Sequence, residues 1–139
     1  MGTRQSSPVP AIGELNHVAL HVQDVARSCD FYSRVLGLQP MARPAFTFPG
    51  AWFRLGLSQE LHLIGDRHEA VHSHHRGTHF ALLTDDTHSW ERHFLELGVT
   101  FQSRQRPDGA SQLFITDPDG HVIELCTRPS APGLPQAAG

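Results

Sequence analysis

The chain carries one segment twice, at an offset of 62 residues. Residues 15–24 read LNHVALHVQD, and residues 77–86 read GTHFALLTDD. Four positions of the first segment recur in the second: His17, Ala19, Leu20 and Asp24 return as His79, Ala81, Leu82 and Asp86. Carried onward, the same offset relates His62 to Glu124. The sequence therefore predicts a single module that is folded twice.

Potential metal ligands occupy equivalent positions in the two copies. The first copy holds His17 and His62, and the second holds His79 and Glu124, each pair with a spacing of 45 residues. The chain has 11 histidines, so one histidine by itself would be weak evidence for a metal. Four ligand-type side chains at two repeated positions rarely arise by chance, and we predict that these four bind one metal ion.

The strand patterns suggest which surface would hold the ion. Residues 15–22 alternate in type, as a half-buried strand does, so the histidines share one face and the apolar residues share the other. We expect the apolar face to pack against a helix and the face with His17 and His21 to line a cavity or solvent. Glu124 is an acid among the apolar residues of the last strand. Burial of an unpaired carboxylate is costly, and a cation would offset the cost.

Each copy reads as strand, helix and three further strands. Asp24 and Asp86 are expected N-caps of the two helices, and Gly37 and Gly98 are expected to end them. A hairpin is expected around residues 58–59 in the first copy. In the second copy the sequence DPDG at residues 117–120 predicts a tight turn between the last two strands.

These elements predict an α+β fold of two βαβββ modules in one domain at residues 15–127. The modules span residues 15–65 and 77–127, and residues 66–76 link them. The linker contains His68, His72, His74 and His75, and its role stays open. Residues 1–14 read as a flexible arm and residues 128–139 as a disordered tail rich in Pro, Ala and Gly.

Composition excludes several classes of function. The net charge is −3 with no block of Lys or Arg, so nucleic acid is not an expected partner. The apolar runs are too short for a transmembrane helix, and no membrane association is expected. Cys29 and Cys126 lie far apart without a CxxC spacing. A reduced, cytoplasmic protein is the simplest expectation.

Four segments together resemble the vicinal oxygen chelate superfamily, which includes glyoxalase I, extradiol dioxygenases, and fosfomycin- and bleomycin-resistance proteins. These segments are LNHVALHV (15–22), FYSRVLGL (31–38), GTHFALLTDD (77–86) and TDPDGHVIEL (116–125). The resemblance implies paired βαβββ modules with sheets that curl around a metal-containing cleft. It also implies His17, His79 and Glu124 as the usual ligands. His62 occupies the position at which the glyoxalase and epimerase branches have a fourth metal ligand.

The resemblance implies a glyoxalase-type lyase or isomerase. Its small oxygenated substrate would chelate a divalent transition metal, and Fe, Mn, Zn, Ni or Co suit imidazole and carboxylate donors. Glu124 or His21 would carry the proton. Glyoxalase I normally has a glutamate at the position of His62, which is a departure from that branch. A homodimer is also implied. The four ligands could come from one chain, or His17 and His62 from one chain and His79 and Glu124 from another.

Two other functions stay open. One is a non-haem Fe(II) dioxygenase, in which His17, His79 and Glu124 form the facial triad and His62 swings away. The other is a non-catalytic ligand-binding protein of the bleomycin-resistance type. A pocket that only sequesters a ligand has no reason to keep four metal-ligand side chains, and this argues against the second alternative.

Overall fold

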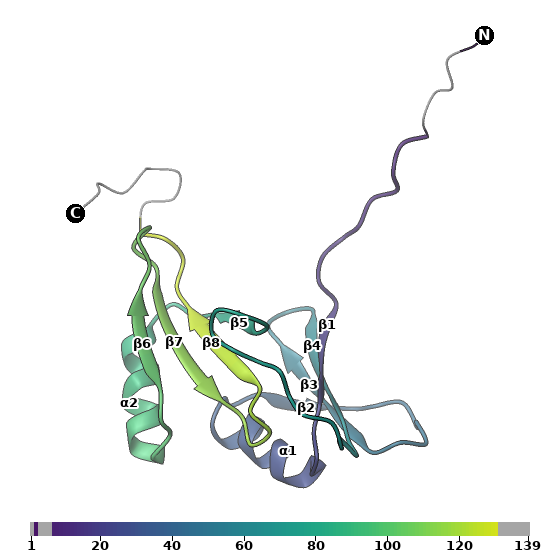
Figure 1. The fold of residues 1–139 in the computed structure, drawn as a ribbon, viewed down its shortest axis with the longest axis horizontal. Helices are drawn as coiled ribbons and strands as arrows, with labels where there is room; N and C mark the ends of the chain where they lie inside the picture. The colour runs from purple at the N-terminus through teal and green to yellow at the C-terminus, as the bar shows by residue number, and fades with distance from the viewer. Residues whose placement is uncertain (1, 3–6, 131–139) are drawn as a thin grey trace.

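The structure is a computed structural model that describes residue 2 and residues 7–130. Its elements are β1 (His17–His21), α1 (Val25–Arg34), β2 (Gln39–Met41), β3 (Gly50–Leu55), β4 (Gln59–Ile64), β5 (Phe80–Leu83), α2 (Thr87–Leu97), β6 (Gln102–Gln105), β7 (Ser111–Thr116) and β8 (Val122–Cys126). The order strand, helix, strand, strand, strand thus occurs twice, and the two modules lie side by side (Figure 1). The tail that is predicted to be disordered spans residues 128–139, and its residues from 131 onward lie outside the described residues.

Each module forms its own four-stranded sheet. The strand orders are β1-β4-β3-β2 and β5-β8-β7-β6. In each sheet the first strand pairs in parallel with the fourth, and the remaining pairs are antiparallel. The registers match as well, since Ala19 pairs with His62 and Ala81 pairs with Glu124. The predicted α+β fold of two equivalent modules is confirmed.

The helix starts follow the predicted caps. The side chain of Asp24 accepts a hydrogen bond from a backbone N–H in the first turn of α1, and Asp86 accepts two in the first turn of α2. Helix α2 ends at Gly98, whose φ of 70° is left-handed. Helix α1 ends at Arg34, before the predicted end at Gly37. Gly37 instead adopts a φ of 66° in the turn that leads into β2.

The core lies between the helices and one face of each sheet. In β1 the apolar side chains point inward, with Leu20 8% exposed, whereas His17, Ala19 and His21 are exposed, as the alternation predicts. The largest fully buried side chains come from both modules: Tyr32, Phe53, Leu61, Leu63, Phe94, Leu113 and Ile123. Each helix packs on its own sheet, and the face with His17 and His21 is left for another role.

The turn between β7 and β8 fastens the second module to the first. Asp119 accepts hydrogen bonds from the backbone N–H of Gln23 at 2.8 Å and from Nη2 of Arg67 at 2.7 Å. Asp117 accepts a hydrogen bond of 2.7 Å from the buried hydroxyl of Tyr32. The sequence predicts this segment only as a turn. Its carboxylates also join residues that lie 52 to 96 positions away.

Several strand boundaries differ from the predicted ones. The turn of the first hairpin is formed by residues 56–58, where Gly56 has a φ of 56°. Strand β6 begins at Gln102, and the preceding residues Val99 and Phe101 are partly buried and pack on the core. Within the described part of the chain, neither helix is long and apolar enough to cross a membrane.

Candidate metal centre

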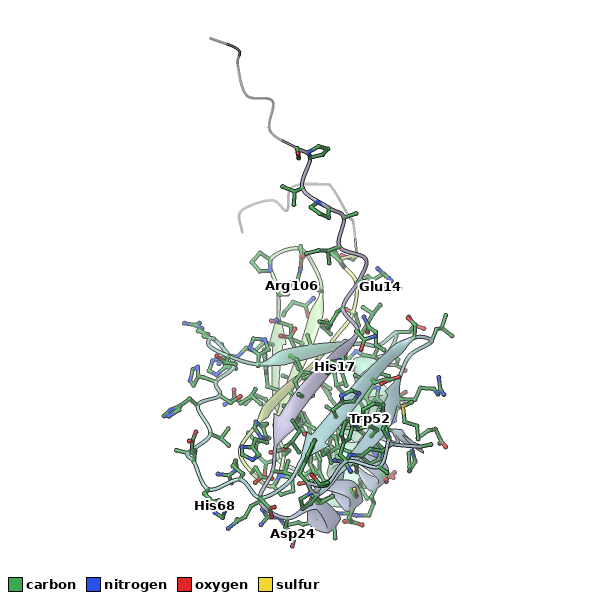
Figure 2. All side chains as sticks on the ribbon, turned by 90° about the vertical axis from the view of Figure 1, so that its right-hand side faces the viewer. Glu14, His17, Asp24, Trp52, His68 and Arg106 are labelled. Carbon is green, nitrogen blue, oxygen red and sulfur yellow. The ribbon has the colours of Figure 1, made fainter. Side chains whose placement is uncertain are left out.

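The first ligand pair lies on the open face of the first sheet. His17 stands at the start of β1 and His62 in the middle of β4, and their rings stack with centroids 4.1 Å apart. The register places the small side chain of Ala19 directly beside His62. On the next strand Trp52 pairs with His62, and these two rings are parallel, at a centroid distance of 3.9 Å. Figure 2 shows His17 and Trp52 on the side of the molecule that faces the viewer.

The second ligand pair lies at the corresponding place in the second sheet. His79 immediately precedes β5, and its Nε2 atom is 3.0 Å from Oε1 of Glu124 on β8. Gln112 on β7 donates a hydrogen bond of 3.0 Å to the other carboxylate oxygen, Oε2. Glu124 is only 5% exposed, so its carboxylate is withdrawn from water and depends on these two partners.

His79 faces a hydrogen-bond acceptor at each of its ring nitrogens. Its Nδ1 atom lies 3.2 Å from the carbonyl oxygen of Gly77, and its Nε2 atom faces the carboxylate of Glu124. Both neighbours are acceptors, but a neutral imidazole has one N–H only. If Nδ1 donates to Gly77, a lone pair of Nε2 meets a carboxylate oxygen. The imidazole of His79 and the carboxylate of Glu124 would together suit a divalent cation, so the donor set fits a metal ion.

One chain does not bring the two pairs together. Among residues 7–130, no three His, Cys, Asp or Glu side chains are grouped so that they could hold a metal ion. The structure thus joins His17 with His62 and His79 with Glu124, as the repeat predicts, but it leaves each pair as half of a site. That all four bind a single ion stays a prediction.

His21, the predicted proton carrier, lies on β1 four residues beyond His17. Its Nε2 atom is 3.0 Å from the carbonyl oxygen of Gly65. Its own carbonyl oxygen is 2.8 Å from Nε2 of His121. His21 and His79 both line a cavity of about 360 Å³ between β1, β5 and the linker. His21 is therefore near the second ligand pair, and its catalytic role stays a prediction.

The histidine-rich linker is tied to the second module. The hydroxyl of Ser73 donates to the carbonyl of Thr78 and accepts from the backbone N–H of Val122. The ring of His75 lies 5.6 Å from that of Phe114, which in turn lies 5.9 Å from the ring of His79. Desolvation and neighbouring cationic groups, Arg104 foremost, lower the pKa of His75. The linker thus approaches the second ligand pair.

Three neighbours of the ligands were not among the predicted site residues: Glu60, Trp52 and Gln112. Glu60 lies two residues before His62 on β4, and its Oε1 atom is 2.9 Å from Nε2 of His62. Strand alternation places the two side chains on one face, so the sequence did contain this signal. Trp52 and Gln112 depend on the registers β3–β4 and β7–β8. Sequence patterns do not specify these registers to the residue.

A family model and curated relatives of this chain point to the same protein family. The family model described as Glyoxalase/Bleomycin resistance protein/Dioxygenase superfamily matches residues 14–125. Among curated proteins, "Glyoxylase I 4" of Arabidopsis thaliana is 30% identical over 87% of this chain and 74% of its own length. "Glutathione transferase FosA" of Serratia marcescens is 30% identical, over 80% of this chain and 78% of its own length.

Solved structures show the same fold at lower identity. A glyoxylase/bleomycin resistance protein/dioxygenase domain from Frankia sp. EAN1pec superposes with a TM-score of 0.72 at 20% identity, over 87% of this chain and 96% of that one. Lactoylglutathione lyase from Agrobacterium tumefaciens gives a TM-score of 0.68, also at 20% identity, over 85% and 96%. These two likenesses concern the arrangement of the sheets and helices.

Proposed function

Because this chain belongs to the glyoxalase/bleomycin resistance protein/dioxygenase superfamily, we propose that it is a metal-dependent lyase or isomerase of the glyoxalase type. Its substrate is a small oxygenated molecule with two adjacent oxygens that chelate the ion. The observation that carries the proposal is the repeated ligand geometry. Each module presents two ligand-type side chains at positions that the repeat relates, and in the second module one of them is the buried carboxylate of Glu124.

A second copy of the chain completes the site in this proposal. His17 and His62 of one molecule would face His79 and Glu124 of another, since each pair lies on a sheet face that the helices of its own chain do not cover. A homodimer in which the same arrangement occurs twice is closed, as most soluble oligomers are. The proposal is supported by the separation of the two pairs within one chain.

Three imidazoles and one carboxylate suit Fe, Mn, Zn, Ni or Co better than Mg or Ca. When bound, such an ion would supply Lewis-acid polarisation of the substrate oxygens. The residues of this chain would orient the ligands and carry the proton. Gln112 holds Oε2 of Glu124 and so orients Oε1 toward the ligand position beside His79.

His21 is the proposed proton carrier. The carbonyl of Gly65 is an acceptor, so Nε2 of His21 keeps its proton and Nδ1 carries the lone pair. Nδ1 would accept a proton from a substrate carbon and return it to the neighbouring carbon. Imidazole suits this role because it titrates near neutral pH. Glu124 is the alternative carrier.

Thiol transfer to a small epoxide is a second candidate. It is favoured by the match to the transferase from Serratia marcescens and by a 25% match to "Metallothiol transferase FosB" of Bacillus licheniformis, which covers 81% of this chain and 74% of that protein. The same metal site would serve both reactions, so the choice depends on the substrate.

Elemental analysis of the purified chain, followed by a substrate screen, tests the proposal. We expect about one transition-metal ion per chain and isomerisation or cleavage of a hemithioacetal. Turnover of an epoxide with a thiol would favour the second candidate, and oxygen consumption with catechols would favour a dioxygenase. A chain that stays metal-free after incubation with each of the five ions would refute the proposed enzyme and favour a binding protein.

A further inference from the structure

The imidazole of His62 is fixed on both of its faces. Trp52 stacks on one face with an interplanar angle of 1° and a centroid distance of 3.9 Å. His17 stacks on the ring at 4.1 Å and 17°. The side chain of His62 is 13% exposed. These contacts define the plane of the ring, so the only freedom left is a half-turn that exchanges the positions of its nitrogen and carbon atoms.

The carboxylate of Glu60 decides between the two orientations. Oε1 of Glu60 lies 2.9 Å from Nε2 of His62, in the ring orientation that the structure has. An ionised carboxylate only accepts hydrogen bonds, so Nε2 must carry a proton to make this contact. A neutral imidazole with its proton on Nε2 has its lone pair on Nδ1. Among residues 7–130, His62 Nδ1 has no hydrogen-bond partner of its own.

We infer that Glu60 is a positioning residue for the metal ligand His62. By accepting the Nε2–H bond, the carboxylate fixes the tautomer and the ring orientation, and it leaves the lone pair of Nδ1 as the one available to a metal ion. Metal-bound histidines commonly donate their second N–H to a carboxylate, which also makes the ligand nitrogen more basic. This inference rests on the proposed metal site, because it assigns His62 a ligand role.

The two modules differ at this position. The offset of 62 residues relates Glu60 to Val122, so the second sheet has no equivalent carboxylate. There His79 turns Nδ1 toward the carbonyl of Gly77 and Nε2 toward Glu124. The duplicated halves would therefore present different ring nitrogens, Nδ1 from His62 and Nε2 from His79. The difference follows from a single side chain on β4.

The tautomer of His62 can be measured without any metal. Long-range proton–nitrogen correlation NMR of the metal-free full chain at pH 8 should show His62 as the Nε2–H tautomer. In Glu60→Gln and Glu60→Ala the Nδ1–H form should gain population. Glu96→Gln, which changes an exposed glutamate on α2, is the charge-matched control and should leave His62 unchanged. Circular dichroism of all variants checks that they fold.

Metal affinity gives the second readout. A Co(II) titration followed by visible absorption should show affinity reduced roughly 10- to 100-fold in Glu60→Gln, and Glu96→Gln should bind like the unmodified chain. A His62 that is doubly protonated or in the Nδ1–H form at pH 8 would overturn the inference, as would unchanged Co(II) affinity in Glu60→Gln. A chain that binds no metal but keeps the Nε2–H tautomer would instead overturn the proposed function.

Discussion

The guanidinium of Arg67 contacts the carboxylate of Asp119 through two nitrogens, with Nε at 3.1 Å and Nη2 at 2.7 Å from Oδ1. The side chain of Asp119 is fully buried, and that of Arg67 is 16% exposed. Ser28 and the backbone N–H of Gln23 donate hydrogen bonds to this carboxylate, and Nη2 of Arg27 lies 3.7 Å from its Oδ1 atom. This ion pair joins the linker, the start of α1 and the last turn, and it thereby holds the two modules in position.

Asp119→Asn should destabilise the protein by about 3 kcal/mol, because it leaves the guanidinium of Arg67 buried without a counter-charge. Asp30→Asn is the matched control. It breaks the exposed pair between Asp30 and Arg34, and we expect an effect of under about 0.5 kcal/mol. Urea unfolding at pH 7 measures both values. Equal stability of the two variants would show that Asp119 does not fasten the modules.

The carboxyl of Asp119 also makes the free energy of unfolding depend on pH. Burial tends to raise the pKa of Asp119, but hydrogen bonds from Arg67 and Gln23 and the charges of Arg67 and Arg27 outweigh burial and lower the pKa below its usual range. A carboxyl with a lower pKa in the folded state stabilises the fold above its unfolded pKa, about 4. This stabilisation is lost as the pH falls through the lower, folded value.

The stability difference between the unmodified chain and Asp119→Asn should therefore shrink as the pH falls from about 5 toward 2. Urea midpoints collected over this range test the expectation. A difference that stays constant with pH would contradict the account.

Tyr32 should resist ionisation for as long as the fold persists. Burial, followed by the charge and hydrogen bond of Asp117, raises the pKa of Tyr32 well above its usual range. A group whose pKa is raised on folding stabilises the protein below its unfolded pKa, about 10. That stability is lost as the pH rises further. Tyr32 is the sole tyrosine, so tyrosinate absorbance reports on it alone.

In an alkaline titration, tyrosinate absorbance should appear together with the loss of circular dichroism, and Tyr32→Phe should show no such absorbance. Ionisation near pH 10 in a chain that is still folded would mean that the hydroxyl is not held by Asp117 as described.

Removal of one member of the second ligand pair should abolish metal binding. His79→Ala and Glu124→Ala should each lose stoichiometric metal while keeping the circular dichroism of the folded chain. Their controls are His88→Ala and Glu96→Ala, which change exposed residues of α2. Elemental analysis after gel filtration gives the comparison. Retention of metal in either ligand variant would exclude that residue from the site.

The sequence predicts the duplicated fold well because the repeat encodes it locally. Asp24 and Asp86 cap the helices as expected, and the ligand pairs meet as the offset implies. The contacts of Asp117 and Asp119 could not be predicted in this way. Their turn has ordinary turn chemistry, and its partners come from distant segments that only tertiary packing brings near.

The site itself is predicted in part. Alternation along β1 correctly places His17 and His21 on its exposed face, opposite to the apolar side chains that pack on the core. Alternation cannot say how far apart two sheets of one chain lie. Among residues 7–130 the two ligand pairs do not gather into one group, and no pattern along a single strand indicates this.

The central claim is that two chains share each metal ion, and mixing of two inactive variants tests it most directly. One chain carries His17→Ala with His62→Ala, and the other carries His79→Ala with Glu124→Ala. Each variant alone should bind no metal. After the two are unfolded and refolded together, a random mixture of dimers should bind about a quarter of the wild-type metal, since half the dimers are mixed and each has one complete site. A mixture that stays metal-free, although gel filtration shows dimers and the unmodified chain regains its metal after the same treatment, would contradict the shared site.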